Sequence, residues 1–368
     1  MNLLSVLLLL TLIILVLYLL YPVYLLSLKK TKTLPQDADI AEEPVSLILL
    51  TYNGIESLRA KLQQLYDQLN EFTTYEFIII DDGSTDGTRE MLTYLKSEYK
   101  YTLVLNDFNT GIPGSMNFAV GIAKYNHLIF CDQRQKLSPN ILKLLTIPLH
   151  NPDIGAVSGC ISYCDCDSKH SLLRWHENFL KKLESRTGCL IGVYGPLYAV
   201  KKSCYVNITH DTILDDLALS LSILPGKQVV LIEDCCITDK NFYKLYDLKR
   251  SKRYLKGLLQ ILHKKELITN LPQRVLIMLI WHKYLRLLIP PLVIACYVTL
   301  AFSIGKGRSE GLIFAAISFF ILLSIIGRRL RFLSSTYSVI SVNICYFCSL
   351  VTLMTDRLLN WATSYKKI

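Results

Sequence analysis

Charged residues are scarce in this sequence of 368 residues, at 19% of the chain, against roughly 25% in soluble domains. Hydrophobic residues make up 51%, which excludes a disordered or collagen-like chain and argues against a simple soluble enzyme. No G-x-G-x-x-G motif follows the first predicted strand, and no Walker lysine motif occurs, which argues against nucleotide-dependent dehydrogenases and P-loop proteins. The net charge is +10, yet no zinc-finger, basic-zipper or recognition-helix pattern accompanies it, so no nucleic-acid partner is expected.

Charge is missing altogether from the beginning of the chain. No charged residue precedes Lys29, and residues 3–28 are almost all Leu, Ile, Val and Tyr. About 20 such residues cross a bilayer, and the small-residue cleavage site of a signal peptide is absent. We therefore predict an uncleaved transmembrane anchor over 1–28. Lys29, Lys30 and Lys32 follow it, which places the next domain in the cytoplasm by the positive-inside bias.

Long apolar runs recur near the other end of the chain. We expect an interfacial helix over 271–286 and a membrane region over 287–360. Three arginines at 328–331 mark a cytoplasmic turn. The charge-free runs cover 287–305, 311–327 and 332–355. They predict two or three spans, because the last run is either a span or a re-entrant or interfacial segment.

Residues 29–270 alternate predicted strands with predicted helices. Residues 45–50 form a continuous apolar run, typical of a parallel strand buried on both faces. Further strands are expected at 77–80, 101–105 and 127–131, each followed by a polar loop. This order predicts an α/β fold with a doubly wound sheet, whose ligands bind beyond the carboxyl ends of the strands.

The polar loops after these strands carry the candidate binding residues. Tyr52 offers a flat face to a base, and Asp81 or Asp82 can accept a hydrogen bond from a base or a ribose. The loop at 81–88 is also explained as a helix cap, because Ser, Thr and Asp at positions 84–86 are favoured caps. Asp132 ends a hydrophobic strand and could ligate a divalent cation that bridges two phosphates, or it is an ordinary turn residue.

Two further features of the chain can each be interpreted in two ways. Asp215 and Asp216 begin a helical pattern, and mutual repulsion would raise the pKa of one of them, as suits a general base. Acids at a helix start also simply complement the helix dipole. The segment 240–265 holds nine Lys or Arg and one acid. It is a lipid-facing or solvated basic surface, or it faces a leaving diphosphate.

The eleven cysteines are scattered, and free thiols are expected in a reducing compartment. Cys160, Cys164 and Cys166 lack a second ligand pair at zinc-like spacing, so a zinc site is not predicted.

Taken in order, these motifs resemble family 2 glycosyltransferases of the membrane-bound polysaccharide-synthase branch, which is related to cellulose, hyaluronan and poly-N-acetylglucosamine synthases. Residues 45–53 and 81–88 resemble the family's opening motifs, and Asp-Gln-Arg-Gln at 132–135 resembles its Asp-Ala-Arg-Gln metal-site motif. Further similarity lies in Gly-Pro-Leu-Tyr-Ala-Val-Lys-Lys at 195–202, in the Asp215-Asp216 pair, and in Arg250, Arg253, Gly257 and Gln260.

The resemblance implies a GT-A fold, which is a Rossmann-like nucleotide-sugar-binding domain. It implies an inverting transfer from a nucleotide-sugar, in particular a UDP-sugar, to a glycan acceptor, with Mg²⁺ or Mn²⁺ at Asp132. Asp216 would be the catalytic base, with Asp215 beside it. The donor-binding residues would be Thr51, Tyr52, Asn53, Asp81, Asp82, Gly111, Asn117 and Asp132. The diphosphate and acceptor residues would be Arg134, Gln135, Arg250, Arg253 and Tyr254.

The same resemblance implies a cellular location and binding partners. The protein would assemble surface polysaccharide or exopolysaccharide of the cell envelope at the inner (cytoplasmic) membrane, in contact with membrane lipids and possible polysaccharide-export proteins. Three positions depart from the family: Gly54 replaces a Glu, Ile112 a donor-phosphate Lys, and Tyr254 a Trp. Asp165-Cys166-Asp167 spells a rival Asp-x-Asp metal motif. A lipid-linked acceptor and an inactive membrane scaffold are the alternative functions.

Overall fold

The computed structural model describes residues 3–31, 43–162, 172–238, 248–301, 317–318, 321, 340–341 and 343–355. Its centre is a sheet of eight strands in the order β3-β2-β1-β4-β7-β6-β8-β5. The strands are β1 (Val45–Thr51), β2 (Tyr75–Asp81), β3 (Thr102–Leu105), β4 (His127–Asp132), β5 (Lys136–Leu137), β6 (Ile154–Ser162), β7 (Leu197–Lys201) and β8 (Gln228–Thr238).

The first half of the sheet has the predicted parallel arrangement. β1 lies between β2 and β4 and pairs with both in parallel, and β3 is parallel to β2. The second half is mixed, because β7 runs antiparallel to both β4 and β6. The apolar run at 45–50 explains the centre: Val45, Leu47, Ile48 and Leu49 are fully buried, as a strand covered on both faces requires. The predicted α/β sheet is thus confirmed.

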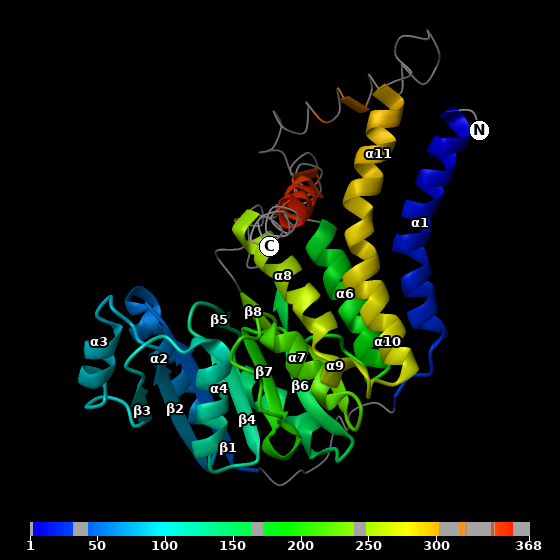
Figure 1. Cartoon of the computed structure of the whole chain (residues 1–368). Coiled ribbons are helices and arrows are strands. Elements are labelled where there is room, and N and C mark those ends of the chain that lie inside the picture. The colour runs from blue at the N-terminus through cyan, green and yellow to red at the C-terminus, as the bar shows by residue number, and fades with distance from the viewer. Residues whose placement is uncertain are drawn as a thin grey trace, which may run out of the picture.

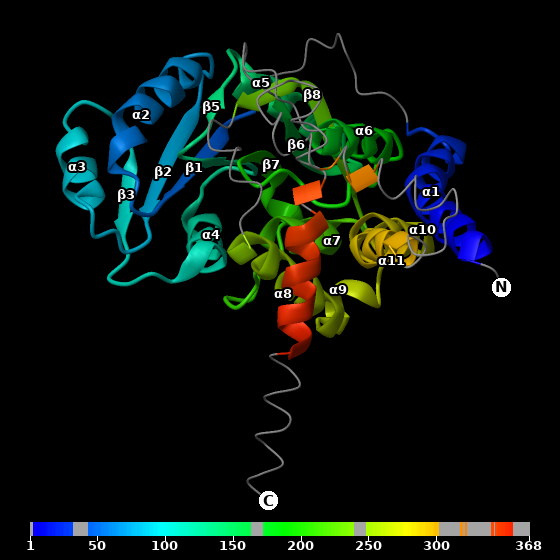
Figure 2. The same ribbon diagram turned by 90° about the horizontal axis from the view of Figure 1, so that it is seen from above.

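Helices cover both faces of this sheet. The helices of the first half are α2 (Ile55–Leu69), α3 (Thr88–Leu95), α4 (Gly111–Ile122) and α5 (Ile141–Thr146), with the 3₁₀ turn η1 (Ile147–His150). The 3₁₀ turn η2 (Lys202–Cys204) precedes α7 (Asp215–Ile223). Figure 2 shows α2 and α5 on one face and α4 and α7 on the other. Leucines at 58, 62, 65 and 69 of α2 are fully buried, which confirms the helical spacing of that segment.

The remaining helices stand beside the sheet domain. α10 (Gln273–Leu279), a π-helical turn η4 (Ile280–Tyr284), a 3₁₀ turn η5 (Leu285–Leu288) and α11 (Ile289–Ala301) follow one another without a break. α1 (Leu3–Ser27) packs along α11 (Figure 1). Three further helices complete the described chain: α6 (Leu172–Arg186), α8 (Leu248–His263) and α9 (Lys265–Ile268). The segment Asn343–Thr355 is also helical.

One helix among the described residues, Gln273–Ala301, is long and apolar enough to cross a membrane. This is fewer than the anchor and the two or three C-terminal spans that the sequence predicts. The predicted anchor does form a helix, the 25-residue α1. Most of the run at 311–327, the arginine cluster at 328–331 and the rival Asp165–Asp167 motif lie outside the described residues.

Candidate active site

Pairing between strands places three of the candidate residues at one edge of the sheet. Thr51 at the end of β1 pairs with Asp81 at the end of β2, and Leu50 pairs with Asp132 at the end of β4. The carboxyl ends of β1, β2 and β4 therefore meet, and we call this the donor edge. Ligands of doubly wound sheets bind at such an edge.

The loops after β1 and β2 are joined by hydrogen bonds. The backbone N–H of Asn53 donates to Oγ of Ser84 at 2.9 Å, and Oδ1 of Asn53 accepts from the N–H of Thr85 at 2.8 Å. Oδ2 of Asp86 accepts from the N–H of Ile55 at 3.1 Å. The alternative in which residues 84–86 cap the following helix holds for Asp86, whose Oδ1 accepts from the N–H of Thr88, the first residue of α3, at 3.0 Å. The N-cap position itself is Gly87, at a left-handed φ of 94°. The polar side chains of this loop therefore hold the β1 loop and also cap α3.

Asp81 and Asp82 have different environments. Asp81 is fully buried; its Oδ2 lies 3.3 Å from Nε of Arg89, while its Oδ1 has no hydrogen-bond partner in the described chain. Buried polar atoms without a partner are rare, and this one fits an N–H donor supplied by a nucleotide base. Tyr52, in the neighbouring loop, is 52% exposed, so its ring remains accessible at the donor edge.

Asp82 organises the loop after β3. Its two oxygens accept from the N–H groups of Thr110 and Gly111, both at 2.9 Å, and from Nδ2 of Asn106 at 2.9 Å. Burial alone would raise the pKa of Asp82, but these hydrogen bonds lower it. Gly111 adopts φ 80°, a conformation that favours glycine. Asp82 and Gly111 therefore shape the donor edge from within the protein.

Asn117 lies on α4, and its side-chain amide forms hydrogen bonds with the segment 205–208 of the protein. Its Nδ2 donates to the carbonyl of Ile208 at 2.7 Å, and its Oδ1 accepts from the N–H of Ile208 and the hydroxyl of Tyr205. Asn117 therefore anchors the 205–208 segment, and its donor contact stays a prediction.

The side chain of Gln133 explains why residue 54 is Gly, where the family has Glu. Its side chain is buried, bonds Thr51 and the carbonyl of Gly54, and donates to Oγ of Ser57 at 3.2 Å. A Cβ added to Gly54 would overlap the side-chain amide of Gln133. Glycine at 54 is therefore paired with glutamine at 133, since Gln133 fills the space that a side chain at 54 would need.

This pairing predicts a non-additive effect. Gly54→Ala should lower the free energy of unfolding by about 1–3 kcal/mol, because the Gln133 amide must leave its hydrogen bonds. In Gly54→Ala/Gln133→Ala the total loss should be smaller than the sum of the two single losses. Denaturant unfolding of the four proteins measures this coupling. Gly121→Ala is the matched control, since an added Cβ there meets nothing within 4 Å. Additive losses would contradict the pairing.

The acidic residues of β4 and α7 converge on the donor edge. Asp132 is partly exposed; its Oδ1 accepts from the N–H of Gln133 at 2.8 Å, and Arg134 lies 3.4 Å from its Oδ2. Burial and the charge of Asp216 raise the pKa of Asp215 to about 7, while Arg253 lowers it and Asp132 raises it further. Asp132, Asp215 and Arg253 therefore lie within electrostatic range of one another.

Asp216 faces a different set of groups from its neighbour. A Cβ added to Gly195 would lie 3.9 Å from Oδ2 of Asp216, so the predicted acceptor segment 195–202 passes directly beside this carboxylate. Asp216 also acts electrostatically on Tyr254 of α8 and on Lys181 of α6. Asp215 lies within electrostatic range of Asp132 and of Tyr198 in the acceptor segment, whereas Asp216 lies beside Gly195 at the start of that segment.

Two buried lysines support the site and were not predicted from sequence. Lys61, 3% exposed, donates to the carbonyl of Gln135 at 2.8 Å and so fixes the loop after Asp132. Lys181, 4% exposed, donates to the carbonyl of Gly192 and lies 4.1 Å over the ring of Tyr194. Burial lowers the pKa of Lys181 to about 8. A lysine on the leucine-rich face of α2 is a signal that could have identified Lys61.

The remaining candidates lie around this centre. Arg250 and Arg253 are exposed on α8, in the first turns of that helix. Groups of three or more His, Cys, Asp or Glu that could hold a metal are absent from the described residues. A cation held by Asp132 would therefore depend on donor phosphates for other ligands, which is the usual mode of Mg²⁺ binding. The residues present fit such a cation.

These features define a Rossmann-like mixed α/β domain with acidic residues at one edge of its sheet, and known proteins with a similar sequence indicate its class. Residues 46–199 match the family model "Glycosyl transferase family 2". This part of the chain is thus similar to the family 2 glycosyltransferases, the family that its motifs resemble.

Two relatives of known name are similar to part of this chain. Over 187 residues the chain is 25% identical to poly-beta-1,6-N-acetyl-D-glucosamine synthase of Staphylococcus epidermidis, which covers 48% of this chain and 45% of that protein. It is 27% identical over 187 residues to poly(ribitol-phosphate) beta-glucosyltransferase of Bacillus spizizenii, covering 50% of this chain and 24% of that protein. The matched part is thus less than half of each relative.

A solved structure shares the fold over almost the whole chain. It is a mannosyltransferase from Pyrobaculum calidifontis in complex with GDP-Man and Mn²⁺, with a TM-score of 0.75 and 19% identity, covering 94% of this chain and 99% of that one. At this identity the likeness concerns the fold. It confirms a GT-A-like mixed α/β architecture.

Proposed function

We propose that this protein is an inverting membrane glycosyltransferase that transfers a sugar from a UDP-sugar to a glycan acceptor during surface-polysaccharide or exopolysaccharide assembly. The observation that carries the proposal is the convergence of Asp132, Asp215, Asp216 and Arg253 at the donor edge of a family 2 domain. A relative named as a polysaccharide synthase supports the class of product.

The roles follow from the placement of each group. Thr51, Tyr52, Asn53 and Asp81 would hold the nucleotide at the donor edge. Asp216 would accept the proton of the acceptor hydroxyl, since it lies beside the acceptor segment. The acceptor oxygen would bond to the anomeric carbon as the bond to the diphosphate breaks, and the electron pair would leave with the diphosphate.

Charge on the departing diphosphate needs stabilisation by fixed cations. Arg253, with Arg250 one helical turn away, is the candidate on α8, and Arg134 with Gln135 is the candidate on the loop after β4. A Mg²⁺ or Mn²⁺ ion at Asp132 would supply further positive charge at the donor phosphates. The solved mannosyltransferase with Mn²⁺ supports this choice of cation.

The membrane part of the proposal rests on the helices beside the sheet. Gln273–Ala301 is long and apolar enough to span, and α1 exposes Leu12, Leu19 and Val23 at 58 to 60%. Exposed aliphatic surface of this extent fits lipid. Placing both helices in the inner membrane would leave the catalytic domain in the cytoplasm, where nucleotide-sugars are made, and would leave room for polysaccharide-export partners.

Donor hydrolysis by the purified full-length chain in detergent tests the activity. We expect slow release of UDP from UDP-sugars when Mg²⁺ or Mn²⁺ is present and none with a chelator. GDP-mannose in the same assay tests the choice of nucleotide. If the chain binds neither nucleotide and releases none, it is a membrane scaffold, the function that Ile112 in place of the donor-phosphate lysine favours.

A further inference from the structure

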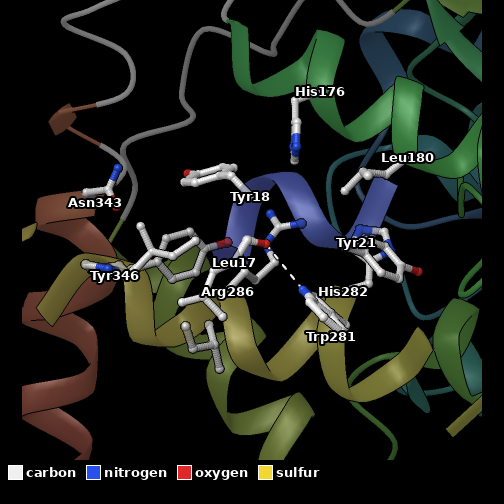
Figure 3. A pocket seen from close by; sticks show the side chains of 13 residues that line it. Leu17, Tyr18, Tyr21, His176, Leu180, Trp281, His282, Arg286, Asn343 and Tyr346 are labelled. Carbon is white, nitrogen blue, oxygen red and sulfur yellow. Dashed lines mark hydrogen bonds between the residues drawn. The ribbon is translucent and has the colours of Figure 1, made fainter. Parts of the chain in front are cut away.

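A second concave site lies away from the donor edge, where α1, α6, the η4–α11 turns and the helix Asn343–Thr355 meet (Figure 3). We call it the helix pocket. Its volume is about 70 Å³, whereas one water needs roughly 10–15 Å³ measured in the same way. The pocket therefore has room for several waters or for a group of the size of a phosphate.

Arg286 provides the positive charge of the helix pocket. Its side chain is 37% exposed, and Nη1 donates to Oε2 of Glu177 at 2.6 Å. Figure 3 shows the guanidinium in the middle of the pocket, beside Tyr18 and below His176. A guanidinium has five N–H donors, so it can hold Glu177 and still donate to an anion in the pocket.

The carboxylates around Arg286 occupy only part of its guanidinium. Among the described residues, Glu177 is the side chain that accepts a hydrogen bond from Arg286. Nζ of Lys283 lies 3.5 Å from the other oxygen of Glu177, Oε1. The second carboxylate, Glu184, is directed elsewhere, because it accepts from Tyr21, His282 and the backbone N–H of Ile191.

The outer side of the helix pocket faces the predicted membrane. Leu17 and Tyr18 of α1 and Ile289 and Pro290 of α11 line it. Both helices expose aliphatic side chains next to the pocket, among them Leu19 at 60% and Val293 at 41%. Tyr18, Trp281 and Tyr346 also line the pocket, and such aromatic side chains are typical of the membrane–water interface.

The inner side of the helix pocket leads toward the proposed base. The ring of Tyr346 in the pocket lies 6.1 Å from the ring of Tyr254 on α8. Tyr254 is within electrostatic range of both Arg286 and Asp216. One tyrosine therefore connects the cationic pocket to the carboxylate beside the acceptor segment.

We propose that the helix pocket binds the phosphate of a lipid-linked acceptor. Arg286 donates to the phosphate, the hydrocarbon chain lies along the exposed faces of α1 and α11, and the head-group sugar extends past Tyr254 toward Asp216. This inference rests on the proposed glycosyltransferase function and specifies that the glycan acceptor is linked to a lipid phosphate, the acceptor named above as an alternative. A neutral glycan would leave the remaining N–H donors of Arg286 in the helix pocket without an anionic acceptor.

Native mass spectrometry of the full-length chain in detergent tests the proposal with a polyprenyl phosphate as the probe. We expect the phosphate to bind, and the corresponding polyprenol and phosphatidylglycerol to bind much more weakly. Arg286→Gln should weaken binding of the phosphate by about 10- to 100-fold, the usual range for a lost charged hydrogen bond. Arg274→Gln, at an exposed position of α10, should leave it unchanged.

The comparison of lipids on the unaltered protein decides the outcome even if Arg286→Gln fails to fold. The double variant Arg286→Gln/Glu177→Gln removes one charge of each sign and serves as the second test of the same contact. Equal binding of phosphate and polyprenol, or of phosphatidylglycerol, would overturn the inference. UDP binding measured on the same samples separates the two ideas: UDP bound without lipid phosphate refutes only the inference, and absence of UDP binding refutes the proposed function.

Discussion

Sugar transfer should fall by about 10²- to 10⁴-fold in Asp216→Asn, the usual contribution of a general base. The asparagine keeps the size of the side chain, and its amide oxygen can still accept from the N–H of Leu217, as Oδ1 of Asp216 does at 2.8 Å. It cannot take a proton from the acceptor hydroxyl. UDP affinity should barely change, because Asp216 faces the acceptor segment. Turnover and UDP affinity measured on one preparation test both statements.

Asp215→Asn is the matched control and should have a smaller effect on turnover. Its main effect should be on stability. Because the folded-state pKa of Asp215 is about 7, against 3.9 for a free side chain, its ionisation destabilises the native protein as the pH rises from about 4 to 7. Between pH 5 and pH 8, the melting temperature of the variant should therefore fall by less than that of the unaltered protein. If Asp216→Asn only lowers stability by about 1 kcal/mol and turns over normally, Asp216 is a helix-start residue and not the base.

Asp132→Ala should weaken UDP binding in the presence of Mg²⁺ or Mn²⁺ by about 100-fold or more. Altering a residue that only hydrogen-bonds a metal ligand already costs about 10- to 100-fold in metal affinity, and Asp132 is proposed as a ligand itself. The reason is that Asp132 is the carboxylate at the donor edge that remains partly exposed, whereas Asp81 and Asp82 are buried. Calorimetric titration with UDP, with and without the metal ion, measures this loss.

The metal-free arm gives the control for Asp132. With a chelator present, the unaltered protein and Asp132→Ala should bind UDP equally weakly. Asp165→Ala and Asp167→Ala should leave binding intact, because they belong to the rival motif. If those two variants lose metal-dependent binding and Asp132→Ala keeps it, the cation site lies at 165–167.

The sequence determined the architecture of the domain because its signals are local. A continuous apolar run such as 45–50 is stable only as a strand covered on both faces, and the leucine spacing of α2 buries one side of a helix. Parallel strands carry their following loops to one edge, so Thr51, Asp81 and Asp132 were expected near each other. The order of these loops was also sufficient to indicate the family.

Only the tertiary structure decided which side chains remain available for chemistry. Asn117 and Asp82 carry suitable groups, and the structure shows that both also hydrogen-bond partners within the protein. Gly54 is explained by Gln133, 79 positions away, and Arg286 is held by Glu177, 109 positions away. Such contacts depend on which surfaces the fold brings together, and no local pattern records them. The surroundings of Asp215 and Asp216 differ for the same reason, because adjacent residues on a helix point in different directions and so meet different neighbours.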